Sequence, residues 1–543
     1  MADFGLLNWM IVAAYMLGNL YLGFKMSGRI RSAEQYYIGD KSAPWWAIGI
    51  SVMATYVSAL SFLGGPAWAY GDGMAALAIH VNYALVIFVC CSLFVPFFYN
   101  AGVVSIYDYL DRRFGVVSRT IMSGLFIVTI TISAASILTA TAIVVTFATG
   151  LDSVYAIFLM TAIVLVYTLM GGMNAVIWTD VLQGIILIIG ACIIFCFLLV
   201  KVGALPDAFA FLQANDKMNP INTDWDFAIA PTIWAGVIAM TVYHITVYGA
   251  NQMMVQRVLA ARTIGDAKKS YLVMGYGAFF LYFVFFFVGA LLYVFYGGKP
   301  FEQTNSIILV FAESLAIPGL LGIIGAAILS ASMSSTSSAF NSLATVTISD
   351  FYKAFFKTDA DDAHYLKASR WVTVLWAAII IPMAIAFVQS TGSILETLSA
   401  VLSYLVGAKM AMYGMGFYSK HVSERGLIIG VIAGFIAVYI SAKGLPAFGI
   451  ADPNIAWPWF AVIGAVVNIV VAWLASLALD GFRDSWHEYS VPGQQDMFAA
   501  ENKEQMENGW YLVPGRVEKP VWGLLIMFAF ILVFLGWFGT LGR

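Results

Sequence analysis

Apolar runs about as long as a membrane-spanning helix follow one another along nearly the whole chain, with short polar segments between them. A helix needs roughly 20 apolar residues to cross a bilayer. Fourteen runs come near that length, at residues 5–24, 44–70, 75–99, 120–149, 153–171, 181–200, 231–252, 271–296, 319–348, 372–389, 396–417, 426–443, 458–479 and 521–540. The pattern predicts an all-α polytopic membrane protein with about 14 transmembrane helices.

The ninth run contains a polar stretch, residues 326–345 (AAILSASMSSTSSAFNSLAT). Its residues Ala331, Ser334, Ser335 and Ser338 fall at i, i+3, i+4 and i+7, which is one face of a helix. One interpretation is close helix packing, because small residues let two backbones approach. The other is a sodium site, since Na⁺ is a hard cation that binds oxygen ligands. We favour the sodium site where other spans supply further ligands.

The second and seventh runs carry signals of a broken helix. The second holds hydroxyl side chains at residues 55–61 and then Gly64-Gly65-Pro66, and the seventh reads VYHITVYGANQ. A simple kink is one explanation for the second run. The alternative is a discontinuous helix, because unpaired backbone within a membrane is tolerated where it lines a cavity or binds an ion. Two such breaks at matching positions are typical of transporters built from inverted repeats.

Composition and charge agree with a membrane protein. The 543 residues are 61% hydrophobic and 10% charged, against roughly 25% charged residues in soluble domains. With the N-terminus placed outside, 21 of the 27 Lys and Arg residues fall in inside segments, five in outside segments and one, Lys409, within a span. The positive-inside rule therefore predicts that both termini lie outside. The four cysteines are expected to be free packing thiols.

Four stretches resemble a known family, the first beginning at residue 34 and the last ending at residue 353. They are EQYYIGDKSAPWWAIGISVMATYVSALSFLGGP, LMGGMNAVIWTDVLQG, NQMMVQRVLAARTIGDAKKS and SSTSSAFNSLATVTISDFYK. Their order and spacing resemble the sodium:solute symporter family, which includes bacterial sodium/galactose, sodium/proline, sodium/pantothenate and sodium/sialic acid symporters. The resemblance implies a LeuT-like 5+5 inverted-repeat core with discontinuous first helices, and Na⁺ as the coupling ion.

The expected organisation follows from the resemblance. An additional N-terminal helix (1–24) precedes the first five-helix repeat (44–202) and the second repeat (228–418). Peripheral C-terminal helices occupy 426–543, with a cytoplasmic loop at 480–520 that is expected to be a connector with a short surface helix.

The resemblance also implies two ion sites. Ala54, Val57 and Ala331 would bind a first sodium through backbone carbonyls, with the hydroxyls of Ser334 and Ser335. Members that couple a second sodium resemble this chain at Asp180, Ser334, Ser337 and Ser338. A carboxylate near a helix start is also common as a cap or first-turn residue, but with both serines present we favour a second ion site.

The expected solute pocket matches no single branch. Sugar-transporting members carry Gln at the position of Ser61 and Glu at the position of His80, and sialic-acid members use an Arg in the fourth span. This chain has neither the Gln nor the Glu at those two positions, and it has no Arg or Lys between Arg119 and Lys201. We expect the pocket to involve Tyr56, Ser58, Ser61, His80, Tyr83, His244, Tyr248 and Lys409. Lys409 either faces the cavity or packs and snorkels toward the interface.

These observations predict sodium-coupled symport, with two Na⁺, of a small organic anion such as a carboxylate. A sugar or other neutral solute is the alternative, and a transporter-like membrane sensor is the alternative from another class. No convergent acid–base, nucleophile or metal constellation indicates an enzyme. The expected partners are the solute, sodium ions and the lipid bilayer, without nucleic acid. We expect a functional monomer in the plasma membrane, which in a bacterium is the inner membrane.

Overall fold

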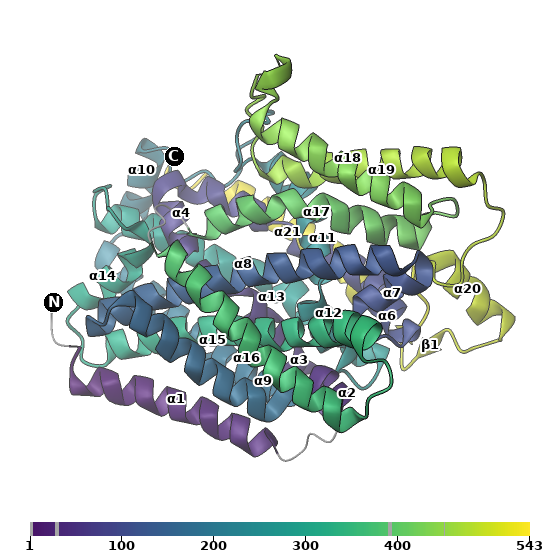
Figure 1. The fold of residues 1–543 in the computed structure, drawn as a ribbon. Helices are drawn as coiled ribbons and strands as arrows, with labels where there is room; N and C mark the ends of the chain where they lie inside the picture. Colours follow the sequence, from purple (N-terminus) through teal and green to yellow (C-terminus); the bar gives the residue numbers. More distant parts are fainter. Residues whose placement is uncertain (1–3, 28–31, 389–393, 450) are drawn as a thin grey trace.

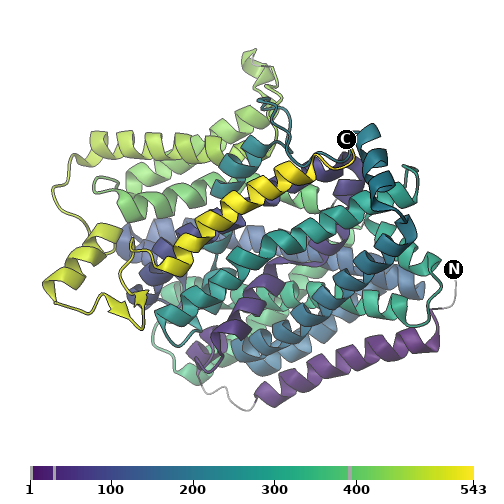
Figure 2. The ribbon, with the colours of Figure 1, turned by 180° about the vertical axis from the view of Figure 1, so that it is seen from behind.

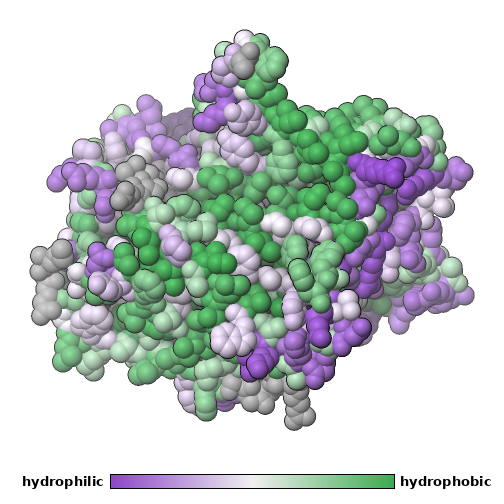
Figure 3. All heavy atoms as spheres, in the orientation of Figure 1, coloured by the Kyte–Doolittle hydropathy of each residue, from purple (hydrophilic) through white to green (hydrophobic). Residues whose placement is uncertain are grey.

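Apolar helices run side by side along one common direction through most of the molecule (Figure 1). The computed structural model describes residues 4–27, 32–388, 394–449 and 451–543. Apolar side chains cover the middle of the face shown in Figure 3, and hydrophilic ones gather toward its two ends. Both termini lie at the same end of the bundle (Figures 1 and 2). Which side of the membrane that end faces stays a prediction.

The first half of the chain holds these elements: α1 (Leu6–Ser27), α2 (Ala33–Ile38), α3 (Trp45–Tyr56), η1 (Leu60–Gly64), α4 (Gly65–Asp72), η2 (Gly73–His80), α5 (Tyr83–Val89), η3 (Cys90–Phe94), α6 (Val95–Ala101), α7 (Ile106–Arg113), α8 (Val116–Thr149), α9 (Ser153–Val202), α10 (Leu205–Ala214), η4 (Ala235–Ala239), α11 (Met240–Tyr248) and α12 (Gln252–Leu259).

The second half holds α13 (Ile264–Phe295), η5 (Thr304–Ser306), α14 (Ile307–Ser314), α15 (Leu320–Val346), η6 (Thr347–Phe356), α16 (Asp362–Phe387), α17 (Ile394–Tyr418), α18 (Glu424–Lys443), η7 (Pro446–Phe448), α19 (Pro458–Asp480), α20 (Val491–Ala500), the antiparallel strands β1 (Met506–Glu507) and β2 (Trp510–Tyr511), and α21 (Lys519–Phe538), which crosses the back of the bundle (Figure 2).

Within the described residues, eleven helical segments are long and apolar enough to cross a membrane by length and composition. Two of them, Leu60–Ala101 with 42 residues and α9 with 50, exceed one crossing. Gly172 interrupts α9 with φ 51° and ψ −150°, and α3 and α11 are short because their spans are broken. The polytopic all-α prediction is confirmed, and the number fourteen stays a prediction.

The helix that begins with α3 is discontinuous, as predicted, but the break lies earlier than Gly64-Gly65-Pro66. The backbone ladder ends where Val57 N donates to the Met53 carbonyl (2.9 Å), and it resumes at the Ser58 carbonyl, which accepts from Phe62 N (3.1 Å). Pro66 instead stands in the first turn of α4, directly after the π-helical turn η1. The carbonyls of residues 54–57 therefore lie outside the helical ladder.

The seventh predicted span is broken as well. α11 ends at Tyr248, and α12 begins after Asn251, whose side-chain oxygen accepts from Met253 N (3.0 Å). Asn251 therefore caps the second half-helix in place of the missing backbone partners. Both breaks predicted from Gly, Pro and polar residues within apolar runs are confirmed.

α15 lies at the centre of the bundle, and every residue from Gly325 to Val346 is buried. A helix that is buried on all faces has no strongly polar face turned toward solvent. The many Ala and Ser residues of α15 also let α3, α8 and α9 approach it closely. This central place puts the serine face of α15 against the break in α3.

The segment at 480–520 contains the short surface helix that the sequence predicted, α20. The hairpin β1–β2 in the same segment was not anticipated. Lys268 Nζ in α13 donates to Glu518 Oε1 (2.5 Å) and to the Tyr511 carbonyl (2.8 Å), so a buried ion pair fixes this segment to the bundle.

Gly289 in α13 is predicted to be sterically required. A Cβ at this position would clash with the Pro66 carbonyl oxygen of α4 and lie 2.8 Å from Pro66 Cα. We expect Gly289→Ala to lower the stability of the detergent-purified protein by about 1–3 kcal/mol, measured by thermal unfolding. Gly277→Ala on the same helix is the control, since its Cβ would meet Met53 Sδ at 3.8 Å, an ordinary contact. Equal losses in both variants would contradict the close approach of α13 and α4.

Candidate functional site

A cavity of about 120 Å³ lies beside the break in α3. The wall is formed by residues of α3, η1, α8, α11, α12, α13, α15 and α17 and by the chain at both helix breaks. Its polar members are Thr55, Tyr56, Ser58, Ser61, Thr129, Ser133, Tyr243, Thr246, Asn251, Tyr282, Ser335, Ser399 and Lys409. The cavity therefore combines hydroxyl groups and one cationic side chain with apolar wall residues such as Ile130, Leu398 and Val406.

Four of the eight predicted solute residues line this cavity: Tyr56, Ser58, Ser61 and Lys409. The other four, His80, Tyr83, His244 and Tyr248, do not line it, which corrects the expectation that the two histidines face the cavity. They form a buried cluster behind Tyr56, whose ring lies 6.2 Å from Tyr83, 5.8 Å from His244 and 5.1 Å from Tyr248. The rings of Tyr56, Tyr243 and Tyr282, which line the cavity, pack against this cluster.

The polar groups of the cluster bond to one another. The His244 ring donates from Nδ1 to Asn82 Oδ1 (2.8 Å), and His80 Nδ1 lies 2.7 Å from the Tyr83 hydroxyl. Ser61 Oγ on the cavity wall lies 3.0 Å from the Tyr282 hydroxyl, and the Tyr282 ring stacks on His80. The cluster thus supports the cavity wall through Tyr56 and Ser61.

Lys409 projects from α17 into the cavity wall and is 7% exposed. Its Nζ lies 3.4 Å from Thr129 Oγ1 of α8, a long contact. Among the described residues no carboxylate lies within 4.0 Å of Nζ. Buried cations are normally paired, so this ammonium group leaves its charge available to an anion in the cavity.

The residues predicted to hold a first sodium are brought together where α15 meets the end of α3. Ser335 Oγ donates to the Thr55 carbonyl (2.7 Å) and lies 3.2 Å from the Ala331 carbonyl. Ala54 and Val57 flank Thr55 at the break, where carbonyls lie outside the helical ladder. Ser335 also lines the cavity, so this group of oxygens adjoins the solute position.

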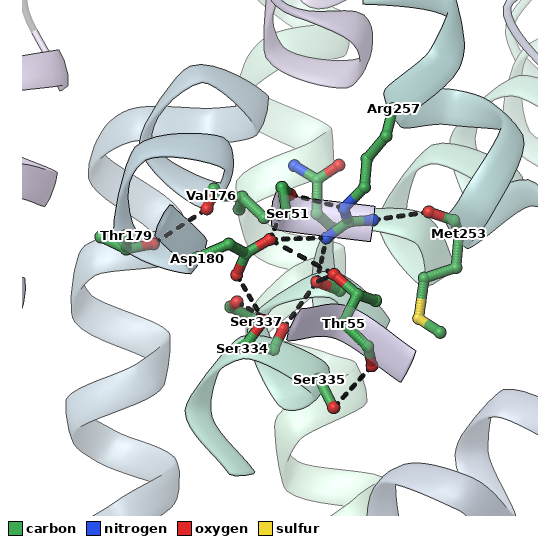
Figure 4. Close-up of polar contacts among 12 residues, drawn as sticks. Ser51, Thr55, Val176, Thr179, Asp180, Met253, Arg257, Ser334, Ser335 and Ser337 are labelled. Carbon is green, nitrogen blue, oxygen red and sulfur yellow. Dashed lines mark hydrogen bonds and ion pairs between the residues drawn. The ribbon is translucent and has the colours of Figure 1, made fainter. Parts of the chain in front are cut away.

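The residues predicted to hold a second sodium surround a buried carboxylate (Figure 4). Asp180 of α9 is fully buried, and its Oδ1 accepts from Ser334 Oγ (2.6 Å). Its Oδ2 accepts from Ser51 Oγ (2.5 Å) and Thr55 Oγ1 (3.3 Å) of α3. Asp180 lies far inside α9, so it is not a cap residue.

Two of the predicted second-site serines donate to backbone as well. The Ser337 and Ser338 hydroxyls both donate to the Ser334 carbonyl of their own helix, at 3.0 and 2.6 Å. Ser338 Oγ also lies 3.4 Å from Thr55 Oγ1. Of the three serines, Ser334 bonds the carboxylate directly. Ser338 contacts Thr55 and Arg257, and Ser337 bonds the backbone of its own helix.

Sequence reasoning missed Arg257, which was counted among the residues of an inside loop. The structure places it in α12, fully buried, with Nη2 3.2 Å from Asp180 Oδ2. Nη2 also donates to Ser338 Oγ, Nε donates to Ser51 Oγ (2.9 Å) and Nη1 to the Met253 carbonyl (2.5 Å). The available signal was its position in an apolar half-helix directly after the break.

A larger cavity of about 430 Å³ lies at the end of the bundle that carries α7. There Arg119 Nε donates to Asp350 Oδ1 (2.9 Å), Ser105 Oγ donates to Asp350 Oδ2 (2.6 Å), and Arg119 Nη1 pairs with Asp111 (3.0 Å). These ion pairs join α7, α8 and η6. Lys353 also lines this cavity, with its Nζ 5.3 Å from the centre of the Tyr365 ring. Among the described residues the cavity therefore carries both paired and unpaired charged side chains at the end of the bundle, away from the break in α3.

The described residues contain no group of three or more His, Cys, Asp or Glu side chains that could hold a metal ion. The four cysteines are free; Cys90 and Cys91 are buried, and Cys192 and Cys196 are exposed. The oxygen-rich groups at the break in α3 are instead suited to a hard monovalent cation.

Comparison with known proteins identifies the family. The family model described as the sodium:solute symporter family matches residues 36–434. The sodium/sialic acid symporter SiaT of Proteus mirabilis (strain HI4320) is 28% identical over 480 residues, which covers 87% of this chain and 94% of that protein. The sodium-coupled monocarboxylate transporter 1 of Homo sapiens is 26% identical over 445 residues, which covers 80% of this chain and 72% of that protein.

A solved structure is similar over almost its whole length. It is described as the substrate-bound outward-open state of a Na⁺-coupled sialic acid symporter that reveals a novel Na⁺ site. The TM-score is 0.80 at 27% sequence identity, with 88% of this chain and 99% of that chain covered. The LeuT-like class of fold expected from the sequence is thereby confirmed.

Ser335→Ala tests the first ion position. Loss of one hydroxyl ligand should raise the sodium concentration for half-maximal thermal stabilisation about tenfold, which corresponds to about 1.4 kcal/mol. The measurement is a thermal-shift titration with NaCl at constant ionic strength, balanced with choline chloride. Ser330→Ala is the matched control, because the Ser330 hydroxyl is buried on the same helix and donates to its own Ala326 carbonyl (2.7 Å). The same shift in both variants would show that Ser335 has no specific role at the ion.

Proposed function

The chain belongs to the sodium:solute symporter family, and from this premise we propose that the solute it carries with sodium is a small organic anion, a carboxylate. Members of this family couple the inward movement of Na⁺ to that of a small organic solute, so the chain is a secondary active transporter with Na⁺ as the coupling ion, and not an enzyme.

Lys409 is the observation that carries the proposal. It is a buried cation on the wall of the cavity, and its only described hydrogen-bond partner is the neutral Thr129 hydroxyl. Leaving a charge unpaired in such a place is unfavourable by several kcal/mol. A carboxylate in the cavity would neutralise it and accept its hydrogen bonds.

The position of Lys409 supports the same solute class. Members that carry sialic acid use an Arg in the fourth span, and this chain has none there. Lys409 reaches Thr129 on α8, the fourth predicted span, from α17 on the other side of the cavity. A positive charge is thus supplied to the same region from a different helix. The relatives named for sialic acid and monocarboxylate also carry organic acids.

The volume of the cavity favours a small solute. About 120 Å³ is well below the roughly 300–1,000 Å³ of pockets that hold drug-sized ligands. Hydroxyl groups at Ser58, Ser61, Ser133 and Ser399 would complete the hydrogen bonds of such a solute. A neutral sugar remains the second candidate among solutes, and no observation favours a sensor without transport.

We further propose that two sodium ions accompany each solute. The first would bind at Ala54, Val57, Ala331, Ser334 and Ser335, and the second at Asp180, Ser334, Ser337 and Ser338. Support for the first comes from the carbonyls freed by the break in α3, and support for the second from the buried carboxylate beside the same serines.

The remaining expectations on organisation stay part of this proposal. We infer two five-helix repeats at residues 44–202 and 228–418, flanked by a first helix and by peripheral C-terminal helices. We propose that the protein lies in the inner membrane of a bacterium with both termini on the outer side, and that the monomer is the functional unit.

Lys409→Met is predicted to weaken solute binding and leave sodium binding nearly unchanged. Removing one charge-assisted pair should lower the affinity for a carboxylate about tenfold or more. The measurement is uptake of radiolabelled short carboxylates by proteoliposomes with an inward sodium gradient, with acetate, lactate, sialic acid and galactose as competitors.

The controls are Lys409→Arg, which keeps the charge, and Lys443→Met, which removes an exposed lysine at the end of α18. Lys409→Arg should retain part of the carboxylate uptake, and Lys443→Met should behave as the wild type. Sodium-driven uptake of galactose that no carboxylate inhibits, with Lys409→Met fully active, would reject the anion and restore the sugar alternative.

The stoichiometry predicts a sodium Hill coefficient above one for solute uptake. Each extra charge moved across 100 mV adds about 2.3 kcal/mol to the driving force, so two ions should also give a steep dependence of uptake on voltage. Asp180→Ala and Ser338→Ala should bring the Hill coefficient to one while Ser330→Ala leaves it unchanged. A coefficient of one in the wild type, unaltered in Asp180→Ala, would argue for a single sodium.

A further inference from the structure

Arg257 occupies the place where the second sodium would bind. Its Nη2 donates both to Asp180 Oδ2 (3.2 Å) and to Ser338 Oγ, two of the residues proposed for that ion (Figure 4). Its Nε donates to Ser51 Oγ (2.9 Å), a hydroxyl that also donates to Asp180. The guanidinium group therefore takes the electrostatic role that a bound cation would have.

Arg257 and Na⁺ cannot bind the oxygens of Asp180 and Ser338 at the same time. Asp180 and Arg257 both have side chains with 0% exposure, so their charges interact with little screening by water. One carboxylate neutralises one positive charge, and a second cation between Asp180 and Ser338 would lie against the guanidinium. Conversely, withdrawal of Arg257 without a replacement would leave a buried unpaired carboxylate, which is strongly destabilising.

The other side-chain polar contacts of the helix that carries Arg257 come from two uncharged residues, Gln252 and Gln256. Gln252 at its start accepts from Ile106 N (2.9 Å) and donates to the Val104 carbonyl (2.7 Å) next to α7. Gln256 donates to the Tyr37 carbonyl of α2 and to Asn341 Oδ1 of α15 (2.7 Å). α12 is eight residues long and follows the break at Gly249–Asn251. Arg257 is thus the one charged anchor that joins this half-helix to α3, α9 and α15.

We propose that Arg257 is a resident cation of the second sodium position and that Na⁺ binds there by exchange with it. When the guanidinium withdraws, Na⁺ takes over the neutralisation of Asp180, and α12 loses its one charged anchor to α3, α9 and α15. Binding of the second ion is in this way linked to release of α12. The inference rests on the proposed second ion at Asp180, and it assigns to Arg257 a positioning role that a structural ion pair alone would not have.

Exchange makes a prediction opposite to that of a purely structural pair. If Arg257 competes with sodium, Arg257→Gln should bind sodium more tightly at the Asp180 position, by about tenfold in half-saturating concentration. The same variant should be less stable than wild type in choline chloride, where no cation replaces the guanidinium. If Arg257 only stabilises the fold, its loss should leave sodium affinity unchanged or lower it.

The test is a thermal-shift titration of the detergent-purified full-length protein with NaCl against choline chloride, without solute. The variants are Arg257→Gln, Arg257→Lys, Asp180→Asn and the double variant Arg257→Gln/Asp180→Asn. We expect the gain in affinity in Arg257→Gln, a value near that of the wild type in Arg257→Lys, and no gain in the double variant. An unchanged or weaker sodium response in Arg257→Gln overturns the exchange.

Hydrogen exchange on the unmodified protein gives a second measurement that does not depend on the folding of a variant. Saturating NaCl should speed amide exchange in residues 252–259 and slow it around Ser334–Ser338, relative to choline chloride. Equal or slower exchange in residues 252–259 with sodium contradicts the release of α12. Both experiments omit solute, so their outcome is independent of whether the carried solute is an anion. If no second sodium binds at Asp180, Asp180→Asn should respond to sodium as the wild type does, which separates that outcome from failure of the exchange.

Discussion

The interior of this protein is arranged around one buried negative charge, that of Asp180. Its two oxygens accept hydrogen bonds from Ser51, Thr55, Ser334 and Arg257, which come from α3, α15 and α12. A carboxylate in this place needs a cation and several donors, because the cost of leaving it unpaired is several kcal/mol. Any rearrangement of these helices must therefore keep Asp180 neutralised, and under the proposed exchange this requirement would let a sodium ion control the conformation.

The breaks in α3 and α11 bring this charge into contact with the solute cavity. Thr55 connects the charge of Asp180 to the cavity. It lines the cavity, its Oγ1 donates to Asp180, and its carbonyl accepts from Ser335. A continuous helix would have used that carbonyl in its own ladder. Within a membrane such a freed carbonyl must be satisfied by protein, water or an ion. The cavity and both proposed ion positions therefore share one short segment of backbone.

The sequence predicted what depends on local pattern and left unpredicted what depends on packing between helices. Apolar runs gave the spans, Gly and polar residues gave the two breaks, and the i, i+3, i+4 spacing placed Ser334, Ser335 and Ser338 on one face of α15. Arg257 was assigned to a loop, because a half-helix of eight residues is too short for hydropathy to distinguish from a connector. His80 and His244 were expected in the cavity, because no pattern along the chain could reveal that the rings of Tyr282 and Tyr56, which pack against them, would line it instead.

The charge of Lys409 bears on the energetics of the whole cycle. Lys409 and Ser335 line the same cavity, so an anion bound there would lie between a fixed ammonium group and the proposed first sodium. The fixed charge holds the anion whether or not sodium has bound, whereas the sodium adds attraction only when present, which makes binding of ion and solute mutually favourable. With two sodium ions and one monocarboxylate, one net positive charge would move per cycle. An inside-negative potential would then drive accumulation by about 2.3 kcal/mol per 100 mV, in addition to the sodium gradient.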